Sequence, residues 1–180
     1  MEVINCIKER RSIRKFTEQV VGHDIMEDII TAATFSSSWK NTQVVRHILI
    51  EDRDLLDEIA NKGVLDFEYN QKTINNAPAM VLVTYVTGRS GYEKDGSFST
   101  SKEDRWEMFD AGIATQTFCL AAHSYGVGSV VMGIFDEEII ANVVKLPEGQ
   151  KIAAIIPIGY PKFAPEAPPR KAVESLLSYR

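Results

Sequence analysis

Seven residues near the N-terminus concentrate side chains that could bind an anion. Residues 10–16 read Arg-Arg-Ser-Ile-Arg-Lys-Phe. In an extended chain, alternate side chains share a face, so Ser12 and Arg14 would point one way while Ile13 anchors the other side. Guanidinium forks and a hydroxyl suit a phosphomonoester, because arginine donates two parallel hydrogen bonds to paired oxygens. For an isolated stretch, a basic surface turn would be the better interpretation.

Two further polar stretches strengthen the case for a ligand site. Residues 37–43 read Ser-Ser-Trp-Lys-Asn-Thr-Gln, and their side chains can both donate and accept hydrogen bonds. Arg170 follows a proline-rich segment, residues 159–169, which has little backbone freedom to lose when it docks. Each stretch alone is more often surface than site, but together they favour a site for a small anionic ligand.

Composition limits the class of protein. A chain of 180 residues fits a single domain, residues 1–180, and 44% hydrophobic with 25% charged residues is ordinary for a soluble globular protein. A net charge of -5 argues against a nucleic-acid partner. Cys6 and Cys119 give no disulfide framework and suit a reducing compartment. With no signal peptide and no apolar run of about 20 residues, we expect a cytoplasmic protein without membrane contact.

Several common catalytic motifs are missing from the sequence. It has no His-Glu-x-x-His, no Gly-x-Ser-x-Gly and no Walker loop, and its three histidines occur in unrelated contexts. Gly126-x-Gly128 resembles the start of a dinucleotide fingerprint, but position 131 is Val and the motif precedes a predicted strand. Simple helix termination is its default explanation.

The hydrophobic pattern predicts a mixture of helices and strands. Helices are expected over residues 2–9, 24–35, 54–60, 66–74, 103–125 and 136–144, and strands over residues 44–50, 79–86, 129–134 and 151–158. The 103–125 helix is rich in small residues that allow close packing, so it should be the central core helix, with a role in subunit contact also open.

Local signals refine these boundaries. Asp24 with Glu27 forms a capping-box pattern, and Asp136 is a candidate N-cap. Pro157 should introduce an irregularity into the last strand. Residues 88–100 are rich in Gly, Ser and charge, so we expect them to be mobile and exposed.

Taken in order, these stretches resemble the motifs of the FMN-dependent nitroreductase family. The resemblance starts with residues 10–16 and continues with Ser38-x-x-Asn41-x-Gln43, which looks like the family's Ser-x-x-Asn-x-Gln-Pro-Trp loop. It extends over nearly the whole chain through Asn76-Ala77-Pro78, Asp110-Ala111-Gly112, Tyr125-Gly126-Val127-Gly128, Leu146-Pro147-Glu148-Gly149, Gly159-Tyr160-Pro161 and Arg170-Lys171.

The resemblance implies an α+β fold with a central, mainly antiparallel sheet flanked by helices and a long core helix. It also implies a homodimer with one FMN in each of two sites at the subunit interface. By analogy, the ribityl phosphate would be held by Arg10, Arg11, Ser12 and Arg170. Arg14 would lie near N1 and O2 of the flavin, where a cation favours the anionic reduced form.

The same resemblance assigns the remaining contacts. Asn70, or its neighbour Gln71, would hydrogen-bond the pyrimidine edge of the ring. Ser38 and Asn41 would reach FMN from the partner subunit. Met132 and Gly133 would lie beside flavin N5, with a backbone N–H as donor, because a glycine lets the backbone approach the ring. No side chain need act as a catalytic acid or base, since the cofactor carries the chemistry.

The sequence departs from the family pattern in places. Val44-Val45 replaces Pro-Trp, Met132 stands where some relatives carry an acid, and the 88–100 stretch replaces a longer lid. The leading hypothesis is an oxidoreductase that uses NADH or NADPH to reduce a small electron acceptor such as a nitroaromatic or a quinone. The alternatives are a dehalogenase-like or flavin-modifying enzyme and a flavin-binding sensor without turnover.

Overall fold

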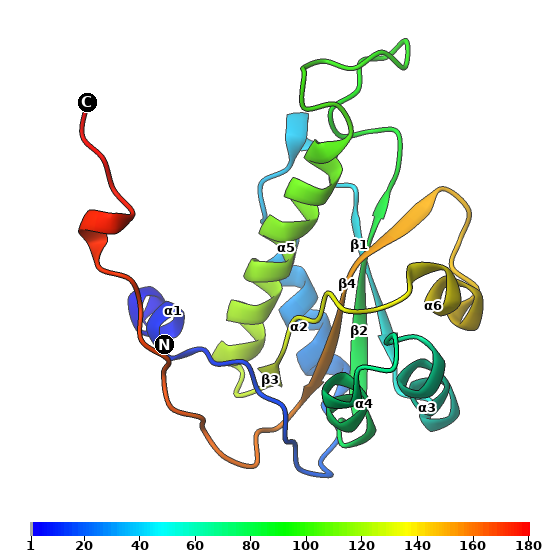
Figure 1. The fold of residues 1–180 in the computed structure, drawn as a ribbon, viewed down its shortest axis with the longest axis vertical. Coiled ribbons are helices and arrows are strands. Elements are labelled where there is room, and N and C mark those ends of the chain that lie inside the picture. The colour runs from blue at the N-terminus through cyan, green and yellow to red at the C-terminus, as the bar shows by residue number, and fades with distance from the viewer. Residues whose placement is uncertain (1) are drawn as a thin grey trace.

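A four-stranded antiparallel sheet with strand order β1-β2-β4-β3 organises residues 2–180, the part of the chain that the computed structural model describes (Figure 1). The strands are β1 (Val45–Ile50), β2 (Ala79–Val86), β3 (Gly128–Ser129) and β4 (Gln150–Gly159). Every neighbouring pair is antiparallel, which confirms the fold class that the sequence resemblance implied. The predicted boundaries of β2 agree with the structure residue for residue.

Helices cover both faces of the sheet, so β2 is buried on both sides (Figure 1). One face carries α2 (His23–Ala33) and α5 (Arg105–Ser124), whose buried side chains pack on Val81 and Val83 of β2. The other face carries α3 (Arg53–Lys62), α4 (Glu68–Asn75) and α6 (Glu137–Val144), which pack on Met80 and Leu82. The alternation along β2 follows from the two-residue period of a strand.

The irregularity in β4 lies four residues away from the predicted position. The register between β2 and β4 shifts between Val83 and Thr84, whose partners are Ala154 and Ile152, while Pro157 pairs in register with Met80. The extra residue, Ala153, forms a β-bulge. Because of it, Ile152 and Ile155 point to the same face although they are three positions apart. Pro157 was therefore the wrong residue for this prediction.

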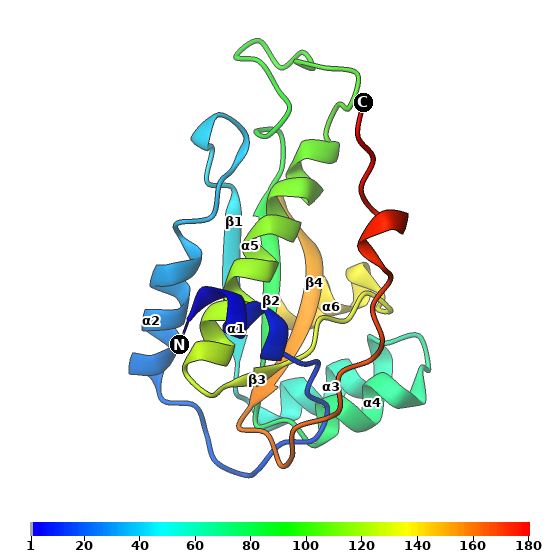
Figure 2. The same ribbon diagram turned by 90° about the vertical axis from the view of Figure 1, so that its left-hand side faces the viewer.

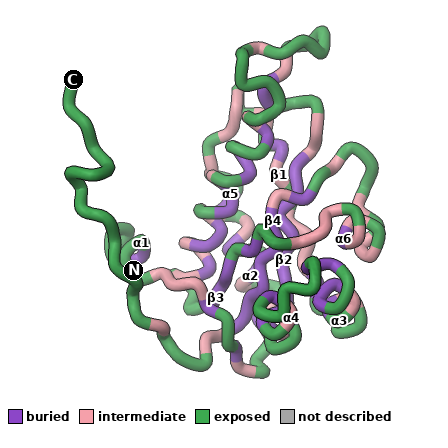
Figure 3. Tube along the Cα trace, viewed as in Figure 1, coloured by how far each residue is buried: buried purple, intermediate pink, exposed green. Residues whose placement is uncertain are grey.

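Both ends of the chain lie outside the sheet and its two helical layers (Figure 2). Helix α1 (Val3–Glu9) contacts α5 through Cys6, whose Sγ donates to the carbonyl oxygen of Leu120 at 3.3 Å. The C-terminal segment after β4 starts beside Phe16, which bridges to Pro161, and then runs outward as a tail that contains the 3-10 helix η2 (Val173–Ser175). Residues 166–180 of this tail are exposed throughout (Figure 3).

Three other local predictions need correction. Asp24 does not cap α2, because Gly22 occupies the N-cap position without a side-chain bond and Asp24 lies inside the first turn. The 129–134 strand shrinks to β3 plus an isolated bridge at Met132: the chain stays hydrogen-bonded to β4 at Val130 and Met132, but regular strand pairing ends at Ser129. The 88–100 segment is not uniformly exposed, since Ser90 and Gly91 are buried. Asp136 does cap α6, accepting the N–H of Ile139 at 3.0 Å.

Candidate functional site

The arginine-rich stretch is fixed to the edge of the sheet by its backbone. The N–H of Ile13 donates to the carbonyl oxygen of Ser129 at 3.0 Å, and Ser12 forms a parallel bridge with the same residue. A Cβ on Gly128 would lie 2.7 Å from Cγ1 of Ile13, so a glycine is needed for this approach. Ile13 is buried and Arg14 exposed, which agrees with the alternation expected of an extended chain.

A second anchor holds the stretch against α4. The Asn76 side chain accepts the N–H of Phe16 at 3.2 Å and donates to the carbonyl oxygen of Arg14 at 3.1 Å. The Arg14 guanidinium lies 5.5 Å from the centre of the Tyr69 ring, within the range of a cation–π contact. The backbone of Arg14 is thus positioned by the loop that follows α4, and its side chain by α4 itself.

The side chains of Arg11 and Arg14 form hydrogen bonds with backbone carbonyls, not ion pairs, in the described part of the chain. Arg11 Nη1 donates to the carbonyl oxygens of Lys8 at 2.6 Å and Arg10 at 2.9 Å. Within residues 2–180, no carboxylate forms a salt bridge with Arg10, Arg11 or Arg14. Burial lowers the pKa of nearby His123; the charge of Glu9 opposes this shift, and the charges of Arg10 and Arg11 add to it. The result is a positively charged surface that can accept an anion from outside the chain.

Asn70 and Gly133 lie close to one another on α4 and the segment that follows β3. Asn70 is buried, and its Nδ2 donates to the carbonyl oxygen of Ile134 at 3.1 Å. Met132 is fixed by backbone hydrogen bonds to Ile155, while Gly133 next to it is exposed. A Cβ on Gly133 would meet no atom within 4 Å. The structure therefore brings together the predicted contacts of a ring edge and a ring face, on the same α4 side as Arg14.

Ser38 and Asn41 lie in a different part of the subunit from Arg14, Asn70 and Gly133. They belong to the loop around the 3-10 helix η1 (Trp39–Asn41), at the N-terminal end of α5, whereas the arginine stretch lies near its C-terminal end (Figures 1 and 2). The ten residues from Asp110, which binds this loop, to Leu120, which binds α1, correspond to about 15 Å of helix. A single subunit does not bring these two groups together.

The predicted phosphate contact nearest the C-terminus is Arg170. It is on the exposed tail, and among residues 2–180 no salt bridge or side-chain hydrogen bond joins it to another residue. The start of the tail does reach the arginine stretch, because the N–H of Lys162 donates to the carbonyl oxygen of Lys15 at 3.0 Å. The two ends of the chain meet there, and only the last part of the tail diverges.

Three of the surface cavities lie in two separate regions, one beside Arg14 and one between α2 and β1. A cavity of about 160 Å³ lies beside Arg14 and is lined by Tyr69 and Phe163. That is small for a cofactor, since small-molecule sites are typically about 300–1,000 Å³. Larger hollows of about 390 and 600 Å³ run between α2 and β1, and the former includes Ser38. The cavity beside Arg14 is therefore too small to enclose a cofactor by itself.

The surface satisfies the chemical requirements of a flavin mononucleotide. Arginines without acid partners and the Ser12 hydroxyl match a phosphate, the buried Asn70 amide matches a polar ring edge, and the open backbone at Gly133 leaves room for a ring face. No group of His, Cys, Asp and Glu in residues 2–180 is arranged to hold a metal ion. No helix in that range is long and apolar enough to cross a membrane.

Two buried residues near the loop that carries Ser38 and Asn41 were not predicted from the sequence as site residues. Asp110 and Ser90 hydrogen-bond each other at 2.6 Å, and Asp110 also binds the backbone of Trp39. An acidic residue among the small and apolar residues of a long helix was the signal that could have identified Asp110, because a buried charge requires partners.

Comparison with known proteins defines the class to which this fold and site belong. The model of the nitroreductase family matches residues 7–160. The chain therefore belongs to the nitroreductase family, as its motifs indicated.

Individual relatives agree with this assignment. The chain is 26% identical over 184 residues to the FMN reductase (NAD(P)H) of Bacillus subtilis, covering 97% of this chain and 72% of that protein. A crystal structure of a nitroreductase family protein from Clostridium novyi matches with 28% identity and a TM-score of 0.77, over 90% of this chain and 86% of that one. An iodotyrosine deiodinase bound to FMN and 3-iodo-L-tyrosine shares the fold, with 18% identity and a TM-score of 0.79 over 99% and 98% of the two chains.

Proposed function

We propose that this protein is an FMN-dependent oxidoreductase that uses NADH or NADPH to reduce a small acceptor such as a nitroaromatic or a quinone. The observation that carries the proposal is the cluster of arginines without acid partners next to Asn70 and Gly133, in a chain of the nitroreductase family. Bound FMN would supply the hydride chemistry at N5, taking a hydride from the reduced nucleotide and passing it on in a separate half-reaction.

The protein groups would bind and orient. Arg10, Arg11 and Ser12 would hold the phosphate, with Arg170 from the tail, and Arg14 would place a positive charge near N1 and O2 of the ring. Asn70 would bind the pyrimidine edge through its carboxamide. The exposed backbone at Gly133 would face N5, where a side chain on residue 133 would keep the ring away, while the buried Met132 would hold this segment in place through its backbone hydrogen bonds to Ile155.

The remaining contacts require a second copy of the chain. Ser38 and Asn41 lie at the opposite end of α5 from the arginines of their own subunit, so we assign them to the FMN of the partner. Elements at the periphery carry exposed apolar side chains that a second subunit would cover. They are Val3, Ile4 and Ile7 of α1, Met108 and Phe109 of α5, and Val173, Leu176, Leu177 and Tyr179 of the tail.

Purification and rapid mixing test this proposal. The protein should be yellow, should release FMN on denaturation, and should be a dimer in solution. Mixing with NADH or NADPH should bleach the flavin, and a quinone should restore the colour. A colourless protein with no affinity for added FMN would contradict the proposal. Bleaching without reoxidation by any acceptor would instead support a sensor.

Two arginine substitutions test the phosphate contacts. Arg11→Ala and Arg170→Ala should each weaken FMN binding by about tenfold, because each removes a charge-assisted hydrogen bond to the phosphate. Arg180→Ala removes a charge from the same exposed tail and should leave FMN binding unchanged. Equal affinities in all three variants would show that the phosphate lies elsewhere.

A further inference from the structure

The loop that carries Ser38 and Asn41 has a strained backbone. Lys40, Asn41 and Gln43 have φ angles of 44°, 56° and 49°, in the left-handed region that residues other than glycine rarely adopt. Three such residues within four positions persist only where surrounding contacts impose them, and such strain often occurs at ligand-binding segments. The 36–43 loop is held partly by its own hydrogen bonds, such as that from the N–H of Gln43 to Oγ of Ser38 at 3.0 Å, and partly by contacts from outside it.

Those contacts converge on one buried carboxylate. Both carboxylate oxygens of Asp110 accept from the N–H of Trp39 at 3.0 Å, and the Ser90 hydroxyl donates to Oδ2 at 2.6 Å. Oγ of Ser90 also lies 2.7 Å from Oγ1 of Thr42. Because the only hydroxyl hydrogen of Ser90 points to Asp110, Thr42 must be the donor in this second bond. Asp110 thus holds the 36–43 loop directly at Trp39 and indirectly at Thr42.

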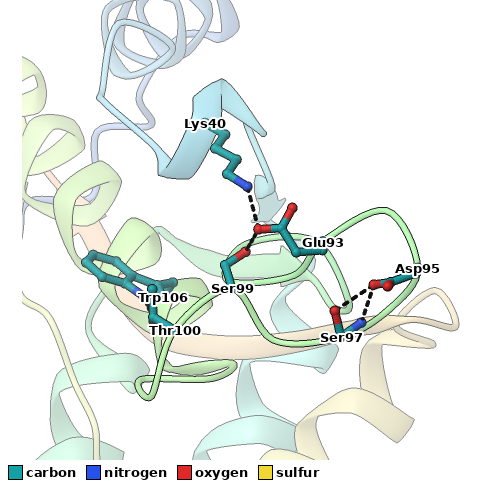
Figure 4. Close-up of polar contacts among 7 residues, drawn as sticks. All are labelled: Lys40, Glu93, Asp95, Ser97, Ser99, Thr100 and Trp106. Carbon is teal, nitrogen blue, oxygen red and sulfur yellow. Dashed lines mark hydrogen bonds and ion pairs between the residues drawn. The ribbon is translucent and has the colours of Figure 1, made fainter.

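Other tethers of this loop are at the surface. Lys40 Nζ lies 2.9 Å from Glu93 Oε1, as Figure 4 shows, but about half of each side chain is exposed, so the pair is screened by solvent. The Trp39 and Trp106 rings lie 4.7 Å apart and add an apolar contact. Asp110 and Ser90 are 2% and 0% exposed, and hydrogen bonds of a buried anion cost most when they are lost.

We propose that Asp110 is a positioning residue of the flavin site. Its carboxylate fixes the strained 36–43 loop in the conformation that presents Ser38 and Asn41 to the FMN of the partner subunit. Through Ser90 it also joins this loop to the 88–104 segment, so that the two loops form one unit. The inference rests on the proposed function, because that function supplies the role of Ser38 and Asn41.

The geometry distinguishes two substitutions at position 110. In Asp110→Asn, the N–H of Trp39 keeps one of its two acceptors, the amide oxygen, while Nδ2 takes the place of Oδ2 and donates to Ser90, whose hydroxyl can turn to donate to Thr42. The chain of hydrogen bonds then reverses its direction and survives. In Asp110→Ala, the N–H of Trp39 and the hydroxyl of Ser90 both lose their partner in a buried place, and the strained loop is released.

The experiment is a set of FMN titrations on the full-length protein, with the thermal midpoint of the FMN-free form measured alongside. Asp110→Ala should weaken FMN binding by about tenfold or more, while Asp110→Asn stays within about threefold of the wild type. Glu107→Gln is the control for loss of a buried acid, since Glu107 lies one turn earlier and binds the N–H of Arg89, a bond that the amide oxygen of Gln can still accept. Its FMN affinity should be unchanged.

A double-mutant cycle separates positioning from general destabilisation. Asn41→Gly removes the amide while fitting the left-handed backbone. If Asp110 acts through this loop, Asp110→Ala combined with Asn41→Gly should lose no more FMN affinity than the worse single variant. If Asp110→Ala does not fold, Ser90→Ala replaces it in the cycle, because this variant keeps the carboxylate. Ser90→Ala should lower FMN affinity by about threefold, and this loss should not add to that of Asn41→Gly.

The outcomes are distinguishable. Additive losses, or an Asp110→Ala protein with wild-type FMN affinity, overturn the positioning role while the proposed function stands. A wild-type protein without FMN affinity overturns the proposed function first.

Discussion

Replacing Gly133 by alanine separates the requirements of the fold from those of the ligand. Within one subunit, nothing demands a glycine there: a Cβ would meet no atom within 4 Å, and the residue is not among the glycines with positive φ. Alanine restricts the unfolded chain more than glycine does. Gly133→Ala should therefore raise the free energy of unfolding of the FMN-free protein by about 0.4–1 kcal/mol.

FMN binding should change in the opposite direction. If the backbone of residue 133 faces the flavin ring, the added methyl group must push the ring away or move the segment. We expect FMN affinity to fall by about tenfold or more, equivalent to at least about 1.4 kcal/mol. The rate of flavin reduction by NADH or NADPH should also fall.

Urea unfolding of the FMN-free protein and fluorescence titration with FMN measure the two effects separately. Gly128→Ala is an informative contrast, because there the added Cβ collides with Ile13 and the fold itself should suffer. A Gly133→Ala protein with unchanged FMN affinity and unchanged reduction rate would refute the placement of residue 133 against the ring.

Three other substitutions have outcomes set by the structure. Gly128→Ala should lower the free energy of unfolding by about 1–3 kcal/mol in urea titrations, through overpacking against Ile13. Asn76→Ala should cost about 1–3 kcal/mol in the same assay, because it frees the backbone of Arg14 and Phe16. Burial lowers the pKa of His47 from 6.5 to about 4, so protonation of the unfolded chain below pH 6.5 destabilises the fold. From pH 7 to pH 5 this costs roughly 2 kcal/mol, and His47→Phe should remove that part of the pH dependence; a mutant with the wild-type pH profile would contradict the assignment to His47.

The fold was predictable from the sequence because its signals were local. The continuous apolar run of β2 and the small-residue interior of α5 can each be identified without knowledge of the rest of the chain. The errors had two sources, one distant in sequence and one local. The bulge at Ala153 depends on the register with β2, and Asp24 lost its capping role to Gly22 by a shift of two residues at the start of α2.

The candidate site was predictable only in part, and the reason is spatial. The sequence placed Arg14, Asn70 and Gly133 in three separate segments, and the structure brings these to the same side of the protein through Asn76 and Ile134. Ser38 and Asn41 stay at the other end of α5. The network around Asp110 escaped prediction, because its partners at Ser90 and Trp39 are 20 and 71 residues away in sequence.

The central claim is that each FMN site combines the arginine stretch of one subunit with the 36–43 loop of the other. A heterodimer of an Arg11→Ala subunit and an Asn41→Gly subunit, isolated with two different affinity tags, tests it directly. One of its two sites would carry both substitutions and the other neither. We predict that the heterodimer holds one FMN with wild-type affinity, although each variant homodimer binds weakly at both sites. A heterodimer with two equally weakened sites would show that every subunit binds FMN with its own residues alone, and would contradict the account.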